Sequence, residues 1–451
     1  MIREDTIAAI ATAPGQGGIG IVRISGPDTE RILKNLFRPS GMKESDEWES
    51  HRMMYGLITD GENTLDECMA VIMRAPRSYT REDVAEIQSH GGTQVLQSIL
   101  AAILKCGARI ADPGEFTRRA FMNGRIDLSR AEAVMELIKA RGDQEQKAAV
   151  RQMTGGTADF IRKASDDLYI LQAGLAACID YPEEISDEEG AGTLRQGLVR
   201  LIATLNNSVD ERSTRLIHDG MQVTLFGVPN AGKSSLLNAL IGQEKAIVTE
   251  IPGTTRDTVE GEMMLDGIRV YLTDTAGMRD TTDPIERIGV KRSEQAWQNA
   301  DIAMLILDGN REITEREREW ISHLHDTDAV IINKSDLPQK TTEELIRAFH
   351  PGIRCMTVSA LDNNSLFPIR DYLRKSAEIR DQLTVTQPRH LDAIKRAISH
   401  LEDAMETIRI WTPDLAETDL QAAQNALGEI TGDQVDEKLL DVVFSSFCVG
   451  K

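Results

Sequence analysis

The chain has 451 residues, a length typical of about three domains, each large enough to bury a core. Its formal net charge of −21 argues against nucleic-acid binding through bulk electrostatics, because affinity for a phosphate backbone normally requires a basic surface. The five cysteines lack the paired spacing of a zinc site or a redox dithiol, which suits a reducing compartment. The first residues lack an apolar signal core and no apolar run approaches membrane-span length, so we expect a soluble cytoplasmic protein.

The order of predicted elements indicates a multidomain protein. Residues 1–118 mix short strand-like runs with turns and one helical run, which predicts an α+β domain. Residues 119–216 have apolar side chains at helical spacing and predict helices, with "DYPEEISDEEGAG" as a solvated connecting loop or, alternatively, a metal site. Residues 217–378 alternate strands with helices, the pattern of a parallel sheet covered on both faces. Helical spacing returns in residues 379–451, so we expect an α/β domain inserted between two halves of an all-α domain.

The run "GVPNAGKSS" matches the phosphate-binding loop pattern in full. It follows the strand-like "MQVTLFG" and precedes a helical run, so backbone N–H groups at a helix N-terminus would meet the phosphates. Gly227 and Gly232 allow the tight path of the loop, Lys233 offers a cation to the outer phosphates, and the Ser234 hydroxyl suits Mg²⁺.

Three further motifs each follow an apolar strand-like run. The carboxylate of Asp274 can hold Mg²⁺ through water, and the glycine of the same motif lets a backbone N–H approach the terminal phosphate. Asp336 can accept two hydrogen bonds from guanine that adenine cannot donate. In this order the motifs predict a GTP site at the carboxyl ends of parallel strands. Their residues are Asp274, Thr275, Ala276, Gly277, Asn333, Lys334, Asp336, Ser359 and Ala360.

The segments before and after the Asp-Thr-Ala-Gly motif contain candidate residues for GTP hydrolysis. Met278 follows the Asp-Thr-Ala-Gly motif, so the water-orienting glutamine of small GTPases is absent there. Glu286 and Arg279 are candidates to position water, with a surface charge as the alternative for each. In "PGTTRD", a threonine hydroxyl, from Thr254 or Thr255, can ligate Mg²⁺ while GTP is bound and release it after hydrolysis.

These motifs, together with "GQGGIGIVRISG", "PGEFTRRAFMNGRIDLSRAEAV" and the terminal "FSSFCVGK", resemble the MnmE (TrmE) family of tRNA modification GTPases over essentially the whole chain. The resemblance implies an N-terminal tetrahydrofolate-binding domain that dimerises, a helical domain, and an inserted GTPase (G) domain. It also implies hydrolysis stimulated by K⁺ and by pairing of G domains, with the monovalent cation supplying the charge that an arginine finger gives elsewhere.

The resemblance carries roles onto individual residues of this sequence. It implies that Glu286 orients the attacking water and that Cys448 is linked to the modification reaction. The ion pair of Arg23 with Glu86, and a small buried apolar Cys448, are the structural alternatives. Arg125 stands where some members have lysine, which leaves its contact geometry open. The implied sets are Ser234 and Thr255 for Mg²⁺; Asn230, Thr249, Ile251 and Thr254 for K⁺; Arg23, Glu86, Arg125 and Lys451 for folate; and, for GTP beside the motifs above, Asn230, Ala231, Gly232, Lys233, Ser234, Ser235, Thr249, Gly253, Thr254 and Thr255.

The chemistry implied by the resemblance joins two proteins. With an FAD-dependent MnmG (GidA) partner, a one-carbon unit from the methylene or formyl form of tetrahydrofolate would reach C5 of the wobble uridine of certain tRNAs, giving aminomethyl or carboxymethylaminomethyl groups. The basic RNA-binding surface would then belong largely to the partner, which explains the acidity of this chain. A ribosome-assembly or RNA-binding GTPase switch, and a folate-dependent methyltransferase with a vestigial G domain, are the alternatives.

Overall fold

The computed structural model describes residues 5–41, 47–181, 183, 187–242, 261–274, 300–379, 385–410, 413–435 and 437–451. The chain forms two compact units. The first comprises Met1–Ile138, Val150–Ala203 and Ala393–Lys451, and the second comprises Lys139–Ala149 and Thr204–Asp392. The four domain ranges expected from the sequence stay a prediction. Within the described ranges, no helix is both long and apolar enough to cross a membrane.

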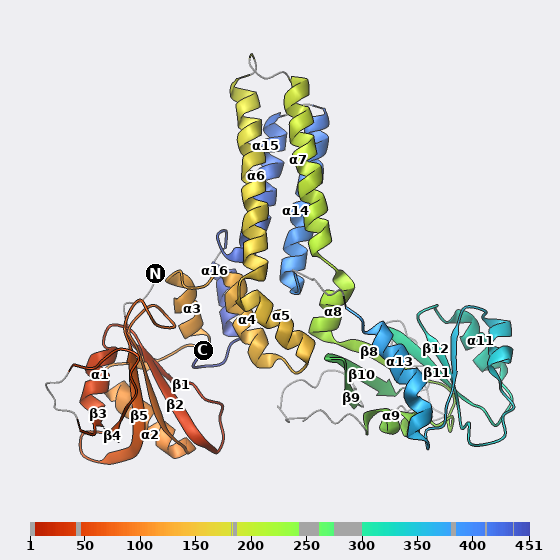
Figure 1. Ribbon diagram of the computed structural model, residues 1–451, viewed down its shortest axis with the longest axis horizontal. Coiled ribbons are helices and arrows are strands. Elements are labelled where there is room, and N and C mark those ends of the chain that lie inside the picture. Colours follow the sequence, from red (N-terminus) through yellow and green to blue (C-terminus); the bar gives the residue numbers. More distant parts are fainter. Residues whose placement is uncertain are drawn as a thin grey trace, which may run out of the picture. The chain divides into compact units, whose positions relative to one another are not determined.

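The N-terminal part of the first unit is a seven-stranded sheet in the order β3-β4-β5-β6-β2-β1-β7 (Figure 1). Its strands pair antiparallel except for β1 with β7. Two helices cover one face, because the apolar side chains of every second strand residue need a partner layer. The elements are β1 (Ile7–Ile10), β2 (Gly17–Ser25), α1 (Thr29–Leu36), β3 (Phe37–Pro39), β4 (Met54–Thr59), β5 (Thr64–Met73), β6 (Val84–Gly91), α2 (Thr93–Lys105) and β7 (Arg109–Ile110).

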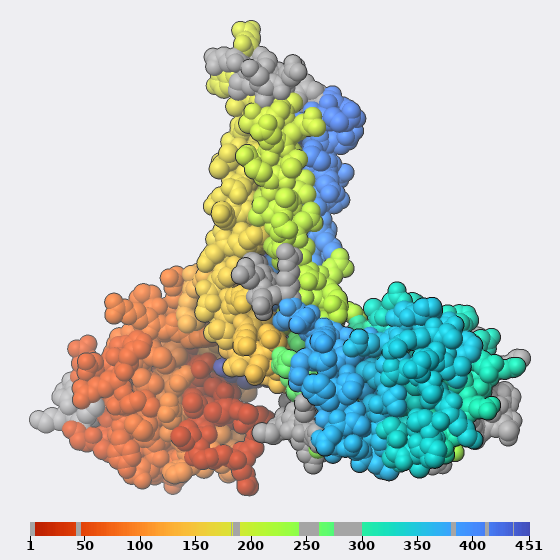
Figure 2. All heavy atoms as spheres, turned by 45° about the vertical axis from the view of Figure 1, so that its right-hand side comes forward, coloured from red at the N-terminus to blue at the C-terminus, as the bar shows by residue number. Residues whose placement is uncertain are grey.

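Long helices make up much of the remainder of the first unit. Helices α6 and α7 lie side by side (Figure 1, Figure 2), and α6 also packs on α15. The predicted spacing is borne out by Leu168 and Leu175 of α6 and Leu420 and Leu427 of α15, which are all fully buried. The helices that lie wholly or largely in this unit are α3 (Glu115–Met122), α4 (Leu128–Lys139), α6 (Gly156–Asp180), α7 (Asp187–Ser208), α14 (Pro388–Arg409), α15 (Pro413–Thr431) and α16 (Glu437–Ser445). Most of helix α5 (Asp143–Met153) and all of α8 (Glu211–Asp219) belong to the second unit.

The second unit contains a six-stranded sheet in the order β13-β12-β11-β8-β10-β9. Its strands run parallel except for β9, which pairs antiparallel with β10 and corrects the prediction of a wholly parallel sheet. The chain enters this sheet from helix α8 and returns to helix α14, so the predicted insertion is confirmed. The elements are β8 (Met221–Phe226), α9 (Lys233–Ile241), β9 (Gly261–Leu265), β10 (Ile268–Asp274), β11 (Ile302–Asp308), α11 (Glu315–His323), β12 (Ala329–Asn333), α12 (Glu343–Phe349), β13 (Arg354–Thr357), the short 3-10 helix η2 (Asn363–Leu366) and α13 (Phe367–Ser376).

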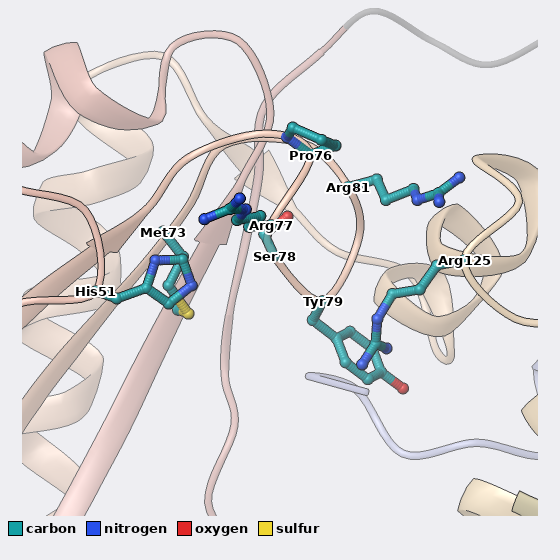
Figure 3. A pocket seen from close by; sticks show the side chains of 8 residues that line it. All are labelled: His51, Met73, Pro76, Arg77, Ser78, Tyr79, Arg81 and Arg125. Carbon is teal, nitrogen blue, oxygen red and sulfur yellow. The ribbon is translucent and has the colours of Figure 1, made fainter. Parts of the chain in front are cut away.

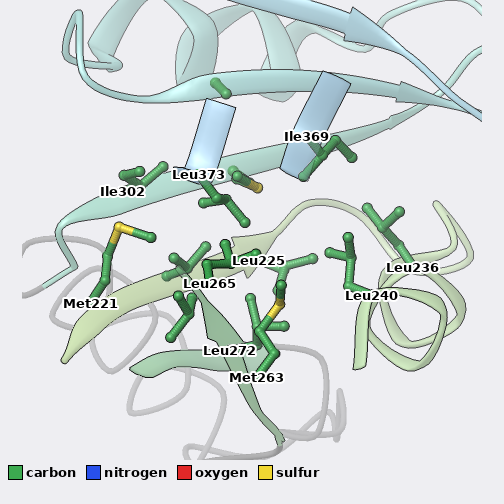
Figure 4. Close-up of a cluster of buried hydrophobic side chains, with 14 of the residues drawn as sticks. Met221, Leu225, Leu236, Leu240, Met263, Leu265, Leu272, Ile302, Ile369 and Leu373 are labelled. Atoms are coloured by element: carbon green, nitrogen blue, oxygen red, sulfur yellow. The ribbon is translucent and has the colours of Figure 1, made fainter. Parts of the chain in front are cut away.

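Apolar side chains fill both faces of the six-stranded sheet. On one face, Leu236 and Leu240 of α9 and Leu373 of α13 meet strand residues such as Leu225 and Leu272 (Figure 4). A second cluster, which includes residues of α11 and α12, covers the other face. Because both faces are buried, the central strands β11 and β12 are apolar up to their last residues, Asp308 and Asn333, so polar groups lie at the strand ends.

Candidate functional site

The loop between β8 and α9 has the backbone expected of a phosphate-binding loop. Gly227 has a φ of 143° and Gly232 a φ of 93°, which L-residues with side chains rarely adopt. A Cβ atom at Gly227 would lie 2.4 Å from the carbonyl oxygen of Ile306, and one at Gly232 would lie 2.2 Å from the side-chain nitrogen of Asn333. Helix α9 begins at Lys233, so its first N–H groups face the loop where an anion binds best.

Lys233 and Ser234 lie at the start of α9 with distinct partners. The Nζ atom of Lys233 donates hydrogen bonds to the carbonyl oxygens of Gly227, at 2.7 Å, and Val228, at 3.0 Å. The hydroxyl of Ser234 donates to the carboxylate of Asp274 at 2.8 Å. Asp274 ends β10 and pairs in register with Leu225 of β8, which brings the two motifs together. A hydroxyl beside a carboxylate is an oxygen-rich setting that fits Mg²⁺.

Asn333, which begins the Asn-Lys-x-Asp motif, contacts both the phosphate-binding loop and the segment that holds Ser359 and Ala360. The side-chain amide of Asn333 donates to the carbonyl oxygen of Ala231 at 2.9 Å and accepts from the N–H of Ala360 at 3.1 Å. The hydroxyl of Ser359 donates to the carboxylate of Asp336 at 2.5 Å. The hydrogen bond from Ser359 positions the Asp336 carboxylate, and Asp336 is exposed and available to a base. The loop, Asn333, Asp336, Ser359 and Ala360 thus form one connected site.

Several predicted site residues lie outside the described residues, so their places are not given. They are Thr249, Ile251, Gly253, Thr254, Thr255, Thr275, Ala276, Gly277, Arg279 and Glu286. Of the predicted K⁺ ligands, Asn230 is described; it is exposed and has a φ of 64°. Ser235 is exposed in the first turn of α9.

A second polar cluster lies in the first unit and gathers segments far apart in the sequence. Arg23 on β2 and Glu86 on β6 are register partners, with Nη2 of the arginine 2.7 Å from Oε1 of the glutamate. Arg23 also donates to the carbonyl oxygen of Gly450 at 3.4 Å. The ion pair that the sequence left as a structural alternative is therefore present, and the predicted folate residues Arg23, Glu86 and Lys451 are brought to one place.

The C-terminal residues are held against the N-terminal sheet. A Cβ atom at Gly450, whose φ is 98°, would lie 2.4 Å from the carbonyl oxygen of Ile10. The N–H of Phe116 donates to the backbone carbonyl oxygen of Lys451 at 3.2 Å. Burial lowers the pKa of the Lys451 ammonium, and the nearby positive charge of Arg23 lowers this pKa further. Cys448 is exposed, so the alternative of a small buried apolar residue is wrong.

The comparisons with known proteins decide the family. A family model described as the N-terminus of the GTP-binding protein TrmE matches residues 6–125, and one described as the MnmE helical domain matches residues 128–448. The chain is 42% identical to a Heliobacterium modesticaldum protein named tRNA modification GTPase MnmE, over 99% of both chains. A protein of the same name from Clostridioides difficile is 40% identical over 100% of both chains. The chain belongs to the MnmE family.

Solved structures match a smaller part of this MnmE-family chain. A variant of Era from Aquifex aeolicus, bound to GDP and an aluminium fluoride, is 26% identical and covers 40% of this chain and 66% of that chain. The TM-score of this match is 0.29, which is too low to support a functional conclusion.

Two residues of this MnmE-family chain belong to the sites but were not predicted. Asp308 ends β11, and its Oδ2 atom lies 2.6 Å from the Nζ atom of Lys334. Burial raises the pKa of Asp308, but the hydrogen bond and the positive charge of Lys334 outweigh burial, so the pKa is lowered overall. The sequence could have indicated Asp308, because this residue ends the apolar run "IAMLILD".

Tyr79 lies between two arginines of the second polar cluster. The guanidinium carbon of Arg23 is 5.6 Å from the centre of the Tyr79 ring, and that of Arg125 is 4.7 Å from it. No sequence pattern marks Tyr79.

Proposed function

We propose that this chain binds and hydrolyses GTP and that hydrolysis drives the modification of tRNA. The observation that carries the proposal is the connected site in which Asn333 joins the phosphate-binding loop to Ala360 while Ser359 holds Asp336. A carboxylate held in this way can accept hydrogen bonds from both N–H groups of the guanine edge. Adenine lacks that pair of donors, so the site favours GTP over ATP.

The metals belong to the same proposal. Ser234 and Thr255 hold Mg²⁺, with Asp274 acting through water, as the close approach of the Ser234 hydroxyl and the Asp274 carboxylate supports. When bound, Mg²⁺ neutralises charge that develops on the phosphates. We assign K⁺ to Asn230, Thr249, Ile251 and Thr254, and its charge would stabilise the same phosphates. Glu286 orients the attacking water.

The second polar cluster is assigned to a tetrahydrofolate derivative in its methylene or formyl form. A flat heterocycle with amine and carbonyl groups on one edge suits a paired guanidinium and carboxylate beside aromatic rings. Arg23 and Glu86 supply the pair, and the rings of Tyr79 and Phe116 lie 5.6 Å and 5.7 Å from the Arg23 guanidinium carbon. Arg125 and Lys451 complete the set.

The reaction proposed needs a partner. An FAD-dependent MnmG (GidA) protein would work with this chain so that the folate one-carbon unit reaches C5 of the wobble uridine as an aminomethyl or carboxymethylaminomethyl group. Cys448 is assigned to this step because it is exposed on the C-terminal segment that contacts Arg23. Both proteins and their tRNA substrate would work in the cytoplasm.

We also propose a homodimer formed through strands β4 and β5, on the face of the N-terminal sheet opposite α1 and α2. Tyr55 and Leu57 of β4 and Met69 of β5 project from this face, with exposed fractions of 52%, 41% and 39%. Tyr55 is the register partner of Met69, so the three side chains form one apolar patch. An exposed apolar patch of this kind favours association with a second copy.

The test removes the C-terminal segment that the proposal assigns to folate chemistry. In cells that carry a chain lacking residues 448–451, we expect tRNA without the wobble modification, measured by mass spectrometry of tRNA nucleosides. GTP turnover by the purified truncated chain should be retained, because the nucleotide site lies in the other unit. An unchanged nucleoside profile would contradict the modification function and favour an RNA-binding GTPase switch.

A further inference from the structure

An open cavity of about 490 Å³ adjoins the second polar cluster. It lies between the end of β5, the segment that leads to β6, and the residues after α3 (Figure 3). Tyr79 and Arg125 line the cavity and also belong to the cluster, so a ligand of the cluster can extend into this space. The lining residues are His51, Met73, Pro76, Arg77, Ser78, Tyr79, Arg81 and Arg125.

The charges that line this cavity are all of one sign. Arg77, Arg81 and Arg125 contribute guanidinium groups, and none of the described residues that line the cavity is an aspartate or glutamate. Arg81 donates to the backbone carbonyl oxygen of Asn123 at 3.0 Å, and in the described part of the chain no carboxylate forms an ion pair with any of the three arginines. In contrast, Arg74, a few residues earlier, is paired with a glutamate. Three unneutralised guanidinium groups around one cavity create a local positive potential in an otherwise acidic chain.

The backbone of the lining supports a binding role. Among the described residues, His51 and Arg81 are two of the few non-glycine residues in the left-handed region, with φ of 65° and 60°. Asn230 and Lys334, two others, belong to the nucleotide site. A residue with a side chain is less stable than glycine at such a φ, and unfavourable backbone of this kind concentrates at functional sites.

We propose that this cavity binds the carboxylates of a γ-linked oligoglutamate tail on the folate, an inference that rests on the proposed folate site. With the heterocycle at Arg23 and Glu86, the tail passes Arg125 and reaches Arg77 and Arg81. Each added glutamate brings one carboxylate, which a planar guanidinium can bind through two parallel hydrogen bonds. The cavity therefore selects folates by tail length, while the cluster recognises the ring.

The experiment measures binding of a formyl tetrahydrofolate with one or with five glutamates to the full-length protein by calorimetry. We expect the pentaglutamate to bind about tenfold more tightly at low salt, as about two exposed ion pairs would provide, and the difference to shrink as salt is added. A variant with Arg77→Gln and Arg81→Gly should lose this difference and keep its affinity for the monoglutamate. Glycine suits the φ of 60° at Arg81, so the variant is expected to fold.

The control is Arg38→Gln, which removes an exposed guanidinium from β3, outside the cavity lining, and should leave the preference intact. Equal affinity of the unmodified protein for the two tail lengths would overturn the proposal while leaving the folate site standing. The proposal would also be overturned if the double variant still bound the pentaglutamate more tightly than the monoglutamate. The same holds if the double variant kept this preference and lost only its binding of tRNA. If the monoglutamate does not bind at all, the folate assignment itself is wrong and the tail site falls with it.

Discussion

Single side chains decide which nucleotide the site accepts. Asp336 is held by Ser359, and its second carboxylate oxygen stays available for the base. An amide in place of the carboxylate presents an N–H group to the guanine edge, which is itself a donor there. Specificity should therefore depend on the Asp336 carboxylate more than on any apolar contact.

Asp336→Asn should weaken GTP binding by about 3 kcal/mol, roughly a hundredfold, because two hydrogen bonds to a charged acceptor are lost. Xanthosine triphosphate, whose ring has a carbonyl where guanine has an amine, should bind the variant better than it binds the unmodified chain. Competition against a fluorescent nucleotide measures both affinities. Asp326→Asn, at an exposed carboxylate not predicted to contact the base, is the control, and unchanged GTP affinity in Asp336→Asn would contradict the base-binding role.

At the level of helices and strands, the sequence could predict the polar residues at strand ends but not the contacts between distant elements. Strand ends with polar motifs, such as Asp274 and Asn333, follow from local patterns, because parallel strands place their carboxyl ends at one edge. Contacts between segments far apart in the sequence could not be predicted from such local patterns. Arg269 of β10 lies 2.6 Å from Glu145 of α5, and the N–H of Gln144 donates to the carbonyl oxygen of Gly267 at 3.3 Å. No periodicity in either segment indicates that the β9–β10 turn packs on α5.

Gly142→Ala tests this packing of the β9–β10 turn. A Cβ atom at Gly142 would lie 2.3 Å from the carbonyl oxygen of Gly267, so the turn must move away from α5. We expect a cost of about 1–3 kcal/mol and amide hydrogen exchange at least about tenfold faster in β9 and β10. Gly192→Ala in α7 is the control, because its Cβ meets nothing within 4 Å. Unchanged exchange in the hairpin of Gly142→Ala would show that the contact does not fix the turn.

The ion pair between Glu30 of α1 and Arg74, the residue after β5, should make the N-terminal domain sensitive to acid. Two hydrogen bonds from Arg74, at 2.6 Å and 3.0 Å, lower the pKa of Glu30 from 4.5 to about 2. Because the pKa is lower in the folded state, the stabilisation is present above pH 4.5 and is lost as the pH falls toward 2.

Glu30→Gln should therefore destabilise the domain at pH 7, by on the order of 1 kcal/mol because the pair is partly exposed, and make a much smaller difference near pH 2. Urea unfolding followed through the buried Trp48, in a variant with no other tryptophan, measures this. Glu49→Gln, which breaks a largely exposed ion pair with Arg52, should have little effect at either pH. Equal destabilisation by Glu30→Gln at both pH values would exclude the ion pair as its cause.

The chain is acidic overall, while its proposed substrate, tRNA, carries negatively charged phosphates. Because like charges repel, we expect the chain to bind tRNA together with other subunits. Leu57→Asp places a charge within the apolar patch formed by Tyr55, Leu57 and Met69. It should shift the protein toward monomer, measured by sedimentation at several concentrations. Gln97→Asp on α2, whose helix covers the opposite face of the sheet, should leave the association unchanged. A Leu57→Asp chain that still sediments as a dimer would place the dimer contact elsewhere.

The most direct test of the account is a reconstituted reaction with this protein, the FAD-dependent partner, unmodified tRNA and a folate one-carbon donor. The wobble nucleoside is measured by mass spectrometry with GTP or a non-hydrolysable analogue, in KCl or NaCl at equal ionic strength. We predict modified uridine with GTP in KCl, little with the analogue or in NaCl, and loss of the K⁺ dependence in Asn230→Ala. Equal modification with GTP and with the analogue would contradict the claim that GTP hydrolysis drives the reaction.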